Sequence, residues 1–441
     1  MRIRLLILLA LAAGSPDTTR ADDWPQWLGP QRDSVWREQG IVERFPDSGL
    51  KVKWRVEVSL GYSGPAVADG RVFVTDYVSR SGNVTNRPGS RDALEGTERV
   101  LCFAADSGKL LWKHEYDRTY RISYPGGPRC TPSVDSGKVY ALGAEGDLLC
   151  LNAADGNVIW SKELTKEYKT ESPIWGFAAH PLIDGDLLYC LVGGKGSVAV
   201  AFNKNTGEEV WRALTASSPG YCPPTMIEHA GTKQLLIWHA DALNALNPLT
   251  GKPYWSVPLK PGFGMSIVAP RKLGRHLFAS GYGKAGVLLK LDDTKPGVEV
   301  VWRGKPKTAV YSENSTPFLL DGMIYGIDGH QGSLIAARIK DGERLWESFR
   351  PTTGGTRRAG HGTAFLVKHK NGFFLFSETG DLILAKLSPK GYEEISRFHV
   401  LDPTNTVFGR NVVWSHPAFA ERCVFARNDK ELVCVSLAAD Q

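Results

Sequence analysis

A tryptophan returns about every 48 residues along most of this chain. The tryptophans that keep this spacing are Trp54, Trp112, Trp160, Trp211, Trp255, Trp302 and Trp346. Most of them stand four residues after a glycine, as Trp160 does after Gly156. A fixed period of this length is the signature of a repeat architecture, in which each unit buries its apolar surface against its neighbours. The chain is therefore expected to fold as a series of similar stacked units.

The clearest unit, residues 132–160, contains four short strand-like runs separated by turns that hold glycine. Turns such as Asp184-Gly185 and Thr206-Gly207 supply the positive φ angles that join antiparallel strands. Four such strands form one blade of a β-propeller. The tryptophan in the fourth strand is expected to lie between blades, with its large ring buried against the neighbouring sheet.

The unit recurs eight times, which predicts an all-β, eight-bladed β-propeller of four-stranded antiparallel sheets over residues 50–441. The seventh unit is degenerate, because Thr363 replaces the opening proline and Phe398 replaces the tryptophan. The eighth unit lacks a fourth strand, so a seven-bladed ring is the alternative. Residues 50–56 have the pattern of a fourth strand without a blade. Pairing this strand with the last sheet closes the ring and removes exposed sheet edges.

The N-terminus has the layout of a secretory signal peptide. Arg2 and Arg4 precede an apolar run at residues 5–13, which is too short to span a bilayer. Cleavage after Ala21 is expected, with Ala13 as the alternative. Residues 22–49, rich in tryptophan and proline at their start, are predicted to form an arm that packs on the propeller. We therefore expect an exported protein of the periplasm or cell envelope, without a transmembrane segment.

The net charge bears on the class of partner, and the cysteine content bears on the core. The formal net charge is +6, and it becomes +4 once the three basic residues and one acidic residue of positions 1–21 are removed. Such a mild charge argues against nucleic acid as a partner. The seven cysteines are expected to be small buried core residues, with a bridge between Cys130 and Cys222 as the one alternative.

A family resemblance follows from the repeat. Residues 132–160, 181–211 and 317–346 are the clearest copies of a repeat with the approximate pattern P-x-V-x-D-G-x-V-Y, then G-x-L-x-x-L-[ND], then D-x-x-T-G-x-x-x-W. This pattern resembles the pyrroloquinoline-quinone-type β-propeller repeat, over residues 50–441. The resemblance implies the propeller fold. It covers both quinoprotein dehydrogenases, which bind the quinone over the ring axis, and BamB-like outer-membrane assembly proteins, which act as scaffolds. The fold alone does not choose between them.

A quinone with three carboxylates needs a cationic cradle and a Lewis acid such as Ca²⁺ held by oxygen ligands. The resemblance also implies an adjacent-cysteine disulfide in the dehydrogenases, and this chain has no adjacent cysteines. Glu313 and Asn314 are the candidate Ca²⁺ ligands. We expect no catalytic residue, no metal site and no cofactor, with pyrroloquinoline quinone and Ca²⁺ as the alternative.

One face of the ring is expected to carry the function. The loops that lead into each inner strand gather there around the axis, and the insertion at residues 79–98 should overhang them. These loops concentrate arginine, histidine and aromatic residues, which hold acidic groups and flat rings. The predicted binding face consists of Arg129, Trp175, His180, Tyr221, Glu313, Asn314, Arg357, Arg358, His361, Arg410, Trp414 and His416.

The leading hypothesis is a non-catalytic, exported, monomeric scaffold that binds a protein or a cell-envelope component through this face or through its blade edges. A quinone- and calcium-dependent alcohol or sugar dehydrogenase is the alternative. A glycan-binding or glycan-acting propeller is the third hypothesis, and a small anionic ligand also suits the composition of the face.

Overall fold

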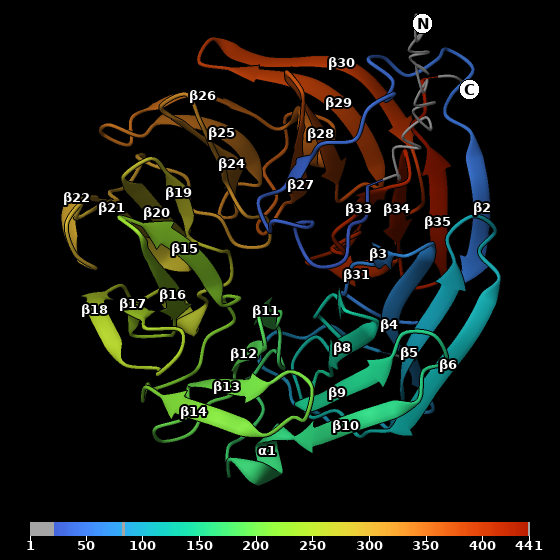
Figure 1. Ribbon diagram of the computed structural model, residues 1–441. Helices are drawn as coiled ribbons and strands as arrows, with labels where there is room; N and C mark the ends of the chain where they lie inside the picture. Colours follow the sequence, from blue (N-terminus) through green and yellow to red (C-terminus); the bar gives the residue numbers. More distant parts are fainter. Residues whose placement is uncertain (1–21, 82–83, 440–441) are drawn as a thin grey trace, which may run out of the picture.

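The computed structural model describes residues 22–81 and 84–439. These residues form eight blades, each a four-stranded antiparallel sheet, arranged as a ring around a central axis (Figure 1). A short fifth strand from the N-terminal region is added to the seventh sheet. The eight-bladed all-β propeller predicted from the repeat is confirmed, and the seven-bladed alternative is wrong. The predicted signal peptide, residues 1–21, lies outside the described residues.

Each blade runs from an inner strand at the axis to an outer strand at the rim. The first blade consists of β3 (Ala66–Ala68), β4 (Arg71–Ser79), β5 (Gly96–Ala104) and β6 (Leu110–Asp117). The second consists of β7 (Ser133–Asp135), β8 (Lys138–Leu142), β9 (Asp147–Asn152) and β10 (Val158–Glu163). The third consists of β11 (Leu182–Asp184), β12 (Leu187–Leu191), β13 (Ala199–Asn203) and β14 (Glu209–Ala213). The fourth consists of β15 (Thr225–His229), β16 (Thr232–Trp238), β17 (Ala242–Leu246) and β18 (Pro253–Pro258).

The second half of the ring repeats this order. The fifth blade consists of β19 (Arg271–Leu273), β20 (His276–Gly281), β21 (Ala285–Leu291) and β22 (Val298–Arg303). The sixth consists of β23 (Phe318–Leu320), β24 (Met323–Asp328), β25 (Ser333–Arg338) and β26 (Arg344–Ser348). The seventh consists of β27 (Ala364–His369), β28 (Gly372–Ser377), β29 (Asp381–Ser388) and β30 (Gly391–His399). Short elements in the connections are α1 (Leu164–Glu167), η1 (Gly262–Gly264), η2 (Tyr282–Lys284), α2 (Arg350–Thr353) and the hairpin strands β31 (Asn405–Val407) and β32 (Arg410–Val412).

The eighth blade closes the ring. It contains β33 (Ala418–Ala420), β34 (Cys423–Arg427) and β35 (Glu431–Ser436), and its outer strand is the N-terminal β2 (Val52–Glu57). Strand β2 pairs antiparallel with β35, with Trp54 opposite Cys434 and Glu57 opposite Glu431. The two ends of the chain thus complete one sheet, as the unpaired N-terminal strand pattern predicts.

The repeated tryptophans tie each blade to the next. The indole N–H of Trp112 donates to the Ala153 carbonyl at 3.0 Å. Gly156 receives this ring at a φ of 77°, and a Cβ there would lie 2.5 Å from the indole. Where a glycine stands four residues before a tryptophan, it therefore makes room for the tryptophan of the preceding blade. Trp255 differs, because its N–H donates to Gln234 of its own sheet at 2.8 Å.

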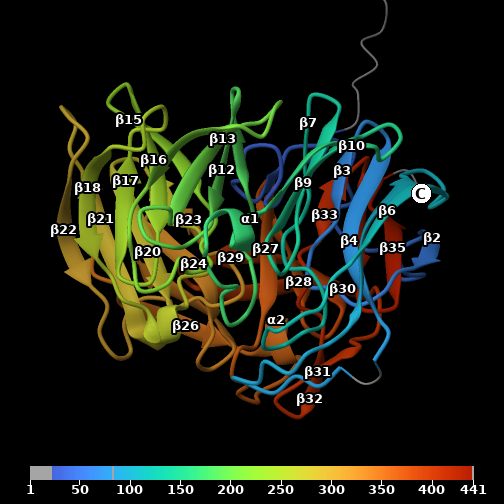
Figure 2. The same ribbon diagram turned by 90° about the horizontal axis from the view of Figure 1, so that it is seen from below.

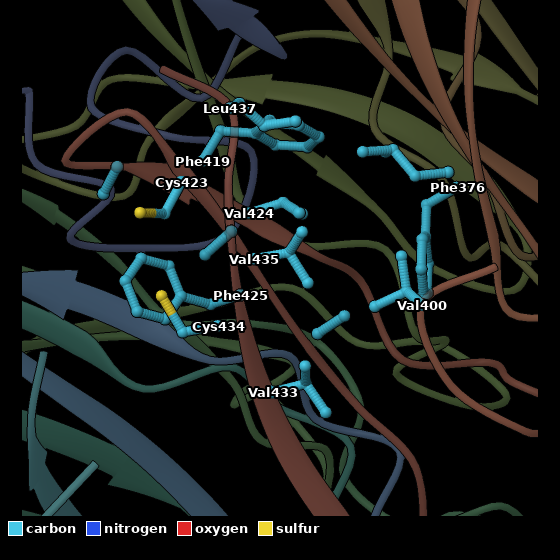
Figure 3. Packing of buried hydrophobic residues seen from close by; sticks show 14 of the residues in the cluster. Phe376, Val400, Phe419, Cys423, Val424, Phe425, Val433, Cys434, Val435 and Leu437 are labelled. Carbon is cyan, nitrogen blue, oxygen red and sulfur yellow. The ribbon is translucent and has the colours of Figure 1, made fainter. Parts of the chain in front are cut away.

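Apolar packing joins the first and last strands as well. Figure 3 shows the cluster of the closing blade, in which Phe419, Phe425, Val433 and Val435 are fully buried. Each such side chain contributes about 1.5–3 kcal/mol relative to an exposed one. All seven cysteines are buried free thiols, and Cys434 belongs to this cluster.

The ring has two different faces, the upper and lower sides of Figure 2. The turn face is formed by the turns between first and second strands and between third and fourth strands. The loop face is formed by the connections between blades and by the loops between second and third strands. The described residues of the insertion, 80–81 and 84–95, lie at the loop face, where the Asn86 amide donates to the Thr406 carbonyl at 3.0 Å. Within the described residues, no helix is long and apolar enough to cross a membrane.

Candidate functional site

The N-terminal arm, residues 22–36, enters the axial channel from the turn face and folds back inside it as a hairpin. At its start the Asp22 carbonyl accepts from the backbone N–H of Glu421, in the turn between β33 and β34, at 3.2 Å. Trp24 and Val67 exchange backbone hydrogen bonds at 2.8 and 2.9 Å. On the return, β1 (Val35–Trp36) pairs parallel with the inner strand β27. The arm therefore occupies the channel of its own ring.

Two arginines fix the arm inside the channel. The Arg32 guanidinium donates to the carbonyls of Pro181 at 2.9 Å and His180 at 3.3 Å, in the third blade. Arg271 of the fifth blade donates to the carbonyls of Arg32 at 3.1 Å and Asp33 at 2.6 Å. Burial lowers the pKa of Arg32 and of Arg271 to about 10, so both remain charged at neutral pH. Backbone carbonyls rather than carboxylates solvate these two cations.

Two histidines predicted for the binding face lie against the arm instead. The ring of Trp27 stacks on His180 at 4.7 Å between centroids and meets His416 edge-on at 5.8 Å. The Nδ1 atom of His180 accepts from the backbone N–H of Thr131 at 2.9 Å. Burial lowers the pKa of His180 well below its usual value and that of His416 to about 3. Both rings are therefore neutral at physiological pH and act as packing surfaces for the arm.

At the loop face, a buried carboxylate holds the β31–β32 hairpin above the channel. Glu378, 2% exposed, accepts from Nε of Arg410 at 2.9 Å and from the indole N–H of Trp414 at 3.3 Å. Arg410 also donates to the Gly360 carbonyl at 2.9 Å. The predicted residues Arg410 and Trp414 are thus brought together, and their polar groups are used to fix the hairpin.

A second buried carboxylate lies under the loop after α2. An oxygen of Glu313, 3% exposed, lies 2.5 Å from Nδ1 of His361. The Asn314 amide donates to the His361 carbonyl at 3.3 Å. The three predicted residues therefore meet, and the two candidate calcium ligands hold His361 in place.

Three further predicted residues line the loop face on the opposite side of the axis. Arg129 donates to carbonyls of its own loop, including that of Ser123 at 3.1 Å, and lies over the ring of Tyr62 at 5.1 Å. Trp175 meets Tyr221 edge-on at 5.6 Å, and burial raises the pKa of Tyr221 to about 12. These groups brace the loops, and the Arg129 guanidinium is already bonded within the chain.

A row of rings crosses the loop face, and we call it the aromatic ridge. Its members, in order, are Phe263, Tyr282, His361, Phe408 and Tyr124. Successive ring centroids are 5.8, 5.8, 5.1 and 6.4 Å apart, and the three central rings are nearly parallel, at interplanar angles of 2° and 7°. Phe263 is 79% exposed and Phe408 is 53% exposed. The sequence had indicated only His361 among the predicted site residues of this ridge.

The backbone of the ridge is strained. The φ angles of Tyr124, Phe263, His361 and Phe408 are 54°, 56°, 58° and 47°, and no other aromatic or histidine residue in the described ranges has a positive φ. The left-handed conformation costs a residue with a Cβ about 1–2 kcal/mol. Phe408 and Gly409 form a two-residue hairpin turn with both φ positive, where Asn-Gly is the favoured pair. A phenylalanine there neither suits the turn nor fills the core.

The loops that carry the ridge have one sign of charge. Residues 121–129, 259–269, 281–285, 354–363 and 404–411 together hold seven arginines and lysines and no aspartate or glutamate. Arg357 and Arg358 are exposed, and neither side chain forms a hydrogen bond or ion pair with the described part of the chain. These two predicted residues thus remain available at the surface beside His361.

A buried carboxyl group lies below the insertion, between the first two blades. Glu98, 2% exposed, accepts hydrogen bonds from the hydroxyls of Tyr116, at 2.6 Å, and Tyr120. Burial raises the pKa of Glu98 to about 7, against the lowering effect of these hydrogen bonds. This carboxyl group therefore titrates near neutral pH.

The residues present do not fit a quinone with calcium. Glu313 is paired with His361, Glu378 with Arg410, and Arg129 with backbone carbonyls. In the described ranges, no three histidine, cysteine, aspartate or glutamate side chains are placed to hold a metal ion. A void between Leu28, Phe365 and His416 and another beside Tyr62 each have a volume of about 10 Å³, room for about one water molecule.

The fold and its tryptophan contacts define an eight-bladed β-propeller of the pyrroloquinoline-quinone-repeat class. The family described as outer membrane protein assembly factor BamB matches residues 96–259 and 239–441. These matches span well over half of the chain, so the protein belongs to this family. The search of curated protein sequences finds no match.

Solved structures from both branches share the fold. BamB from Moraxella catarrhalis is 17% identical with a TM-score of 0.56, over 88% of this chain and 97% of that one. Quinohemoprotein alcohol dehydrogenase from Comamonas testosteroni is 13% identical with a TM-score of 0.60, over 94% and 80%. A europium-containing methanol dehydrogenase is 12% identical with a TM-score of 0.57, over 94% and 89%. At these identities the likeness shows the fold alone.

Proposed function

We propose that this protein is a non-catalytic scaffold of the cell envelope that binds a protein partner through its loop face. The observation that carries the proposal is the exposure of Phe263 and Phe408 on a face whose buried carboxylates, Glu313 and Glu378, are already paired within the chain. Exposed aromatic rings and arginines are the residues that dominate protein–protein binding energy. A small ligand bound on the ring axis would need space in or over the channel, and the arm lies inside this channel.

An exported location agrees with this proposal. Residues 1–21 have the pattern of a secretory signal, and the matching family is described by a role in outer membrane protein assembly. We therefore place the protein in the periplasm or at the envelope, with a protein rather than a small molecule as its partner.

Site-specific photo-crosslinking tests the proposal. A photoreactive phenylalanine analogue replaces Thr356, exposed on the loop face, or Leu249, which is 72% exposed on the turn face. In cells that export the protein, we expect discrete crosslinked products from position 356 and none from position 249. Absence of crosslinks from the loop face, or equal crosslinking from both faces, contradicts the proposal.

A reconstitution assay tests the dehydrogenase alternative directly. The purified protein is incubated with pyrroloquinoline quinone and Ca²⁺, and reduction of an artificial electron acceptor is followed with alcohols and sugars. We expect no substrate-dependent reduction, because the candidate calcium ligand Glu313 is paired with His361, and Arg129 is bonded to backbone carbonyls. Substrate-dependent turnover would overturn the scaffold proposal.

A further inference from the structure

The aromatic ridge combines three properties that the fold itself does not require. Its two phenylalanines contribute little to the core, since Phe263 is 79% and Phe408 is 53% exposed. Four of its five residues have a left-handed backbone, which favours glycine or asparagine. Strained backbone that persists in a rigid surround is found preferentially at binding sites.

The surround is rigid on both sides of Phe408. Arg410 is bonded to buried Glu378 at 2.9 Å, and the Asn86 amide of the insertion donates to the Thr406 carbonyl at 3.0 Å. One face of the Phe408 ring stacks on His361 at 5.1 Å. The hairpin therefore presents this ring in a fixed position, so little conformational entropy is lost when a partner covers it.

We infer that the aromatic ridge is a docking site for an acidic segment of a partner polypeptide. The inference rests on the proposed scaffold function and names the chemistry of the partner. The five loops that carry the ridge hold seven basic residues and no acidic residue. Arg357 and Arg358 lie exposed beside His361 and form bidentate bonds readily with carboxylates. Apolar side chains of the partner pack on the ring edges while its carboxylates meet the arginines.

The ring geometry favours a polypeptide over a glycan. Sugars bind aromatic residues through the ring faces. Tyr282, His361 and Phe408 are nearly parallel, at 2° and 7°, with centroids 5.8 and 5.1 Å apart, so each neighbouring ring obstructs access to part of the face between them. Ring edges suit aliphatic and aromatic side chains, whose packing needs no free ring face.

Two substitutions separate docking from folding. The first is the double variant Phe263→Asn/Phe408→Asn. Asparagine adopts positive φ readily, so the melting temperature should be equal to that of the wild type or higher. Leu249→Asn, at an exposed position of the turn face, is the matched control. A clear drop in melting temperature of the double variant would show that the rings hold the fold, and would overturn the inference.

Peptide selection identifies the partner chemistry without knowledge of the partner. A random dodecapeptide library displayed on phage is selected on the wild-type protein, with depletion on the double variant in each round. The enriched peptides should be rich in aspartate and glutamate with interspersed apolar residues. Their affinity should fall about tenfold or more in the double variant and in Arg357→Glu/Arg358→Glu, fall with added salt, and stay unchanged in Leu249→Asn.

Several outcomes overturn the inference. These are no enrichment over the double variant, enriched peptides without acidic residues, and ring-dependent binding of polysaccharide or phosphatidylglycerol vesicles in place of peptide. Crosslinks from position 356 that persist in the double variant would refute the ridge and leave the scaffold function standing. Absence of crosslinks from position 356 in the otherwise wild-type protein would refute the scaffold function itself.

Discussion

Large aromatic rings lie at both ends of the axial channel, but they are buried at the turn face and exposed at the loop face. At the turn face, the arm inserts Trp24, Trp27 and Trp36, which are 3%, 4% and 2% exposed. At the loop face, the aromatic ridge leaves Phe263 at 79% and Phe408 at 53% exposure. Both ends use large rings, but only the rings of the arm are buried by the fold.

This difference separates stability from binding. The tryptophans of the arm bury apolar surface, and two arginines bond its backbone to the third and fifth blades. The rings of the ridge are more exposed than the tryptophans of the arm, and their backbone is strained. Strain of this kind is typical of binding sites, so we attribute it to partner binding. The arm should therefore respond to mutation with unfolding, and the ridge with loss of binding.

The largest effect is expected for Trp27→Ala. Removing a 4% exposed indole that stacks on His180 leaves a cavity inside the channel, and the free energy of unfolding should fall by about 3–5 kcal/mol. Chemical denaturation measures this change. Trp175→Ala, at a half-buried position on the loop face, should cost much less. An equal loss in both variants would show that the arm adds no special stability.

Acid should destabilise the fold through His416, which packs against the arm. The pKa of His416 is about 3 in the folded protein, below its usual value of 6.5, so the unfolded chain binds the extra proton between these values. The free energy of unfolding should therefore fall as the pH falls from about 6.5 toward about 3. His416→Gln, which does not titrate, should flatten this dependence in denaturation series at several pH values. An unchanged slope would contradict the packing role of His416.

A rise in pH toward neutral should destabilise the fold through Glu98, which lies beneath the insertion. We expect this effect to be smaller than that of His416. The pKa of Glu98 is about 7 in the folded protein and 4.5 in an ordinary setting, so the folded state retains its proton between these values. The free energy of unfolding should fall as the pH rises from about 4.5 to about 7. Glu98→Gln keeps an acceptor oxygen for one tyrosine hydroxyl and can donate its NH2 to the oxygen of the other. It should remove this slope, while exposed Glu115→Gln should not. Identical pH profiles of wild type and Glu98→Gln would show that the carboxyl is not titrating there.

The sequence predicts the ring because the information is local and repeated. The glycines that precede most of the tryptophans, such as Gly156, contact the tryptophan of the preceding blade. The strand at residues 52–57 completes the sheet of the last blade. Hydrophobic burial and turn chemistry then decide the blade count. The degenerate seventh unit is still a full blade, because its first three strands keep continuous runs of buried residues although Phe398 replaces tryptophan.

The candidate site was harder to predict because it depends on where loops meet. His180, His361 and His416 have similar positions in their units, yet two of them contact the arm and the third pairs with Glu313. The path of the arm is a long-range feature that no local pattern fixes. The signal for Phe408 was present in the sequence, since a phenylalanine before glycine in a short V-F-G-R hairpin takes a position that asparagine fills better.

Hydrogen–deuterium exchange of the protein with and without a selected acidic peptide tests the division between the two ends most directly. The account predicts new protection in residues 354–363 and 404–411, which carry His361 and Phe408, and none in the arm, residues 22–36. Protection of the arm without protection of the ridge loops would contradict it, because the partner would then act at the buried end of the channel.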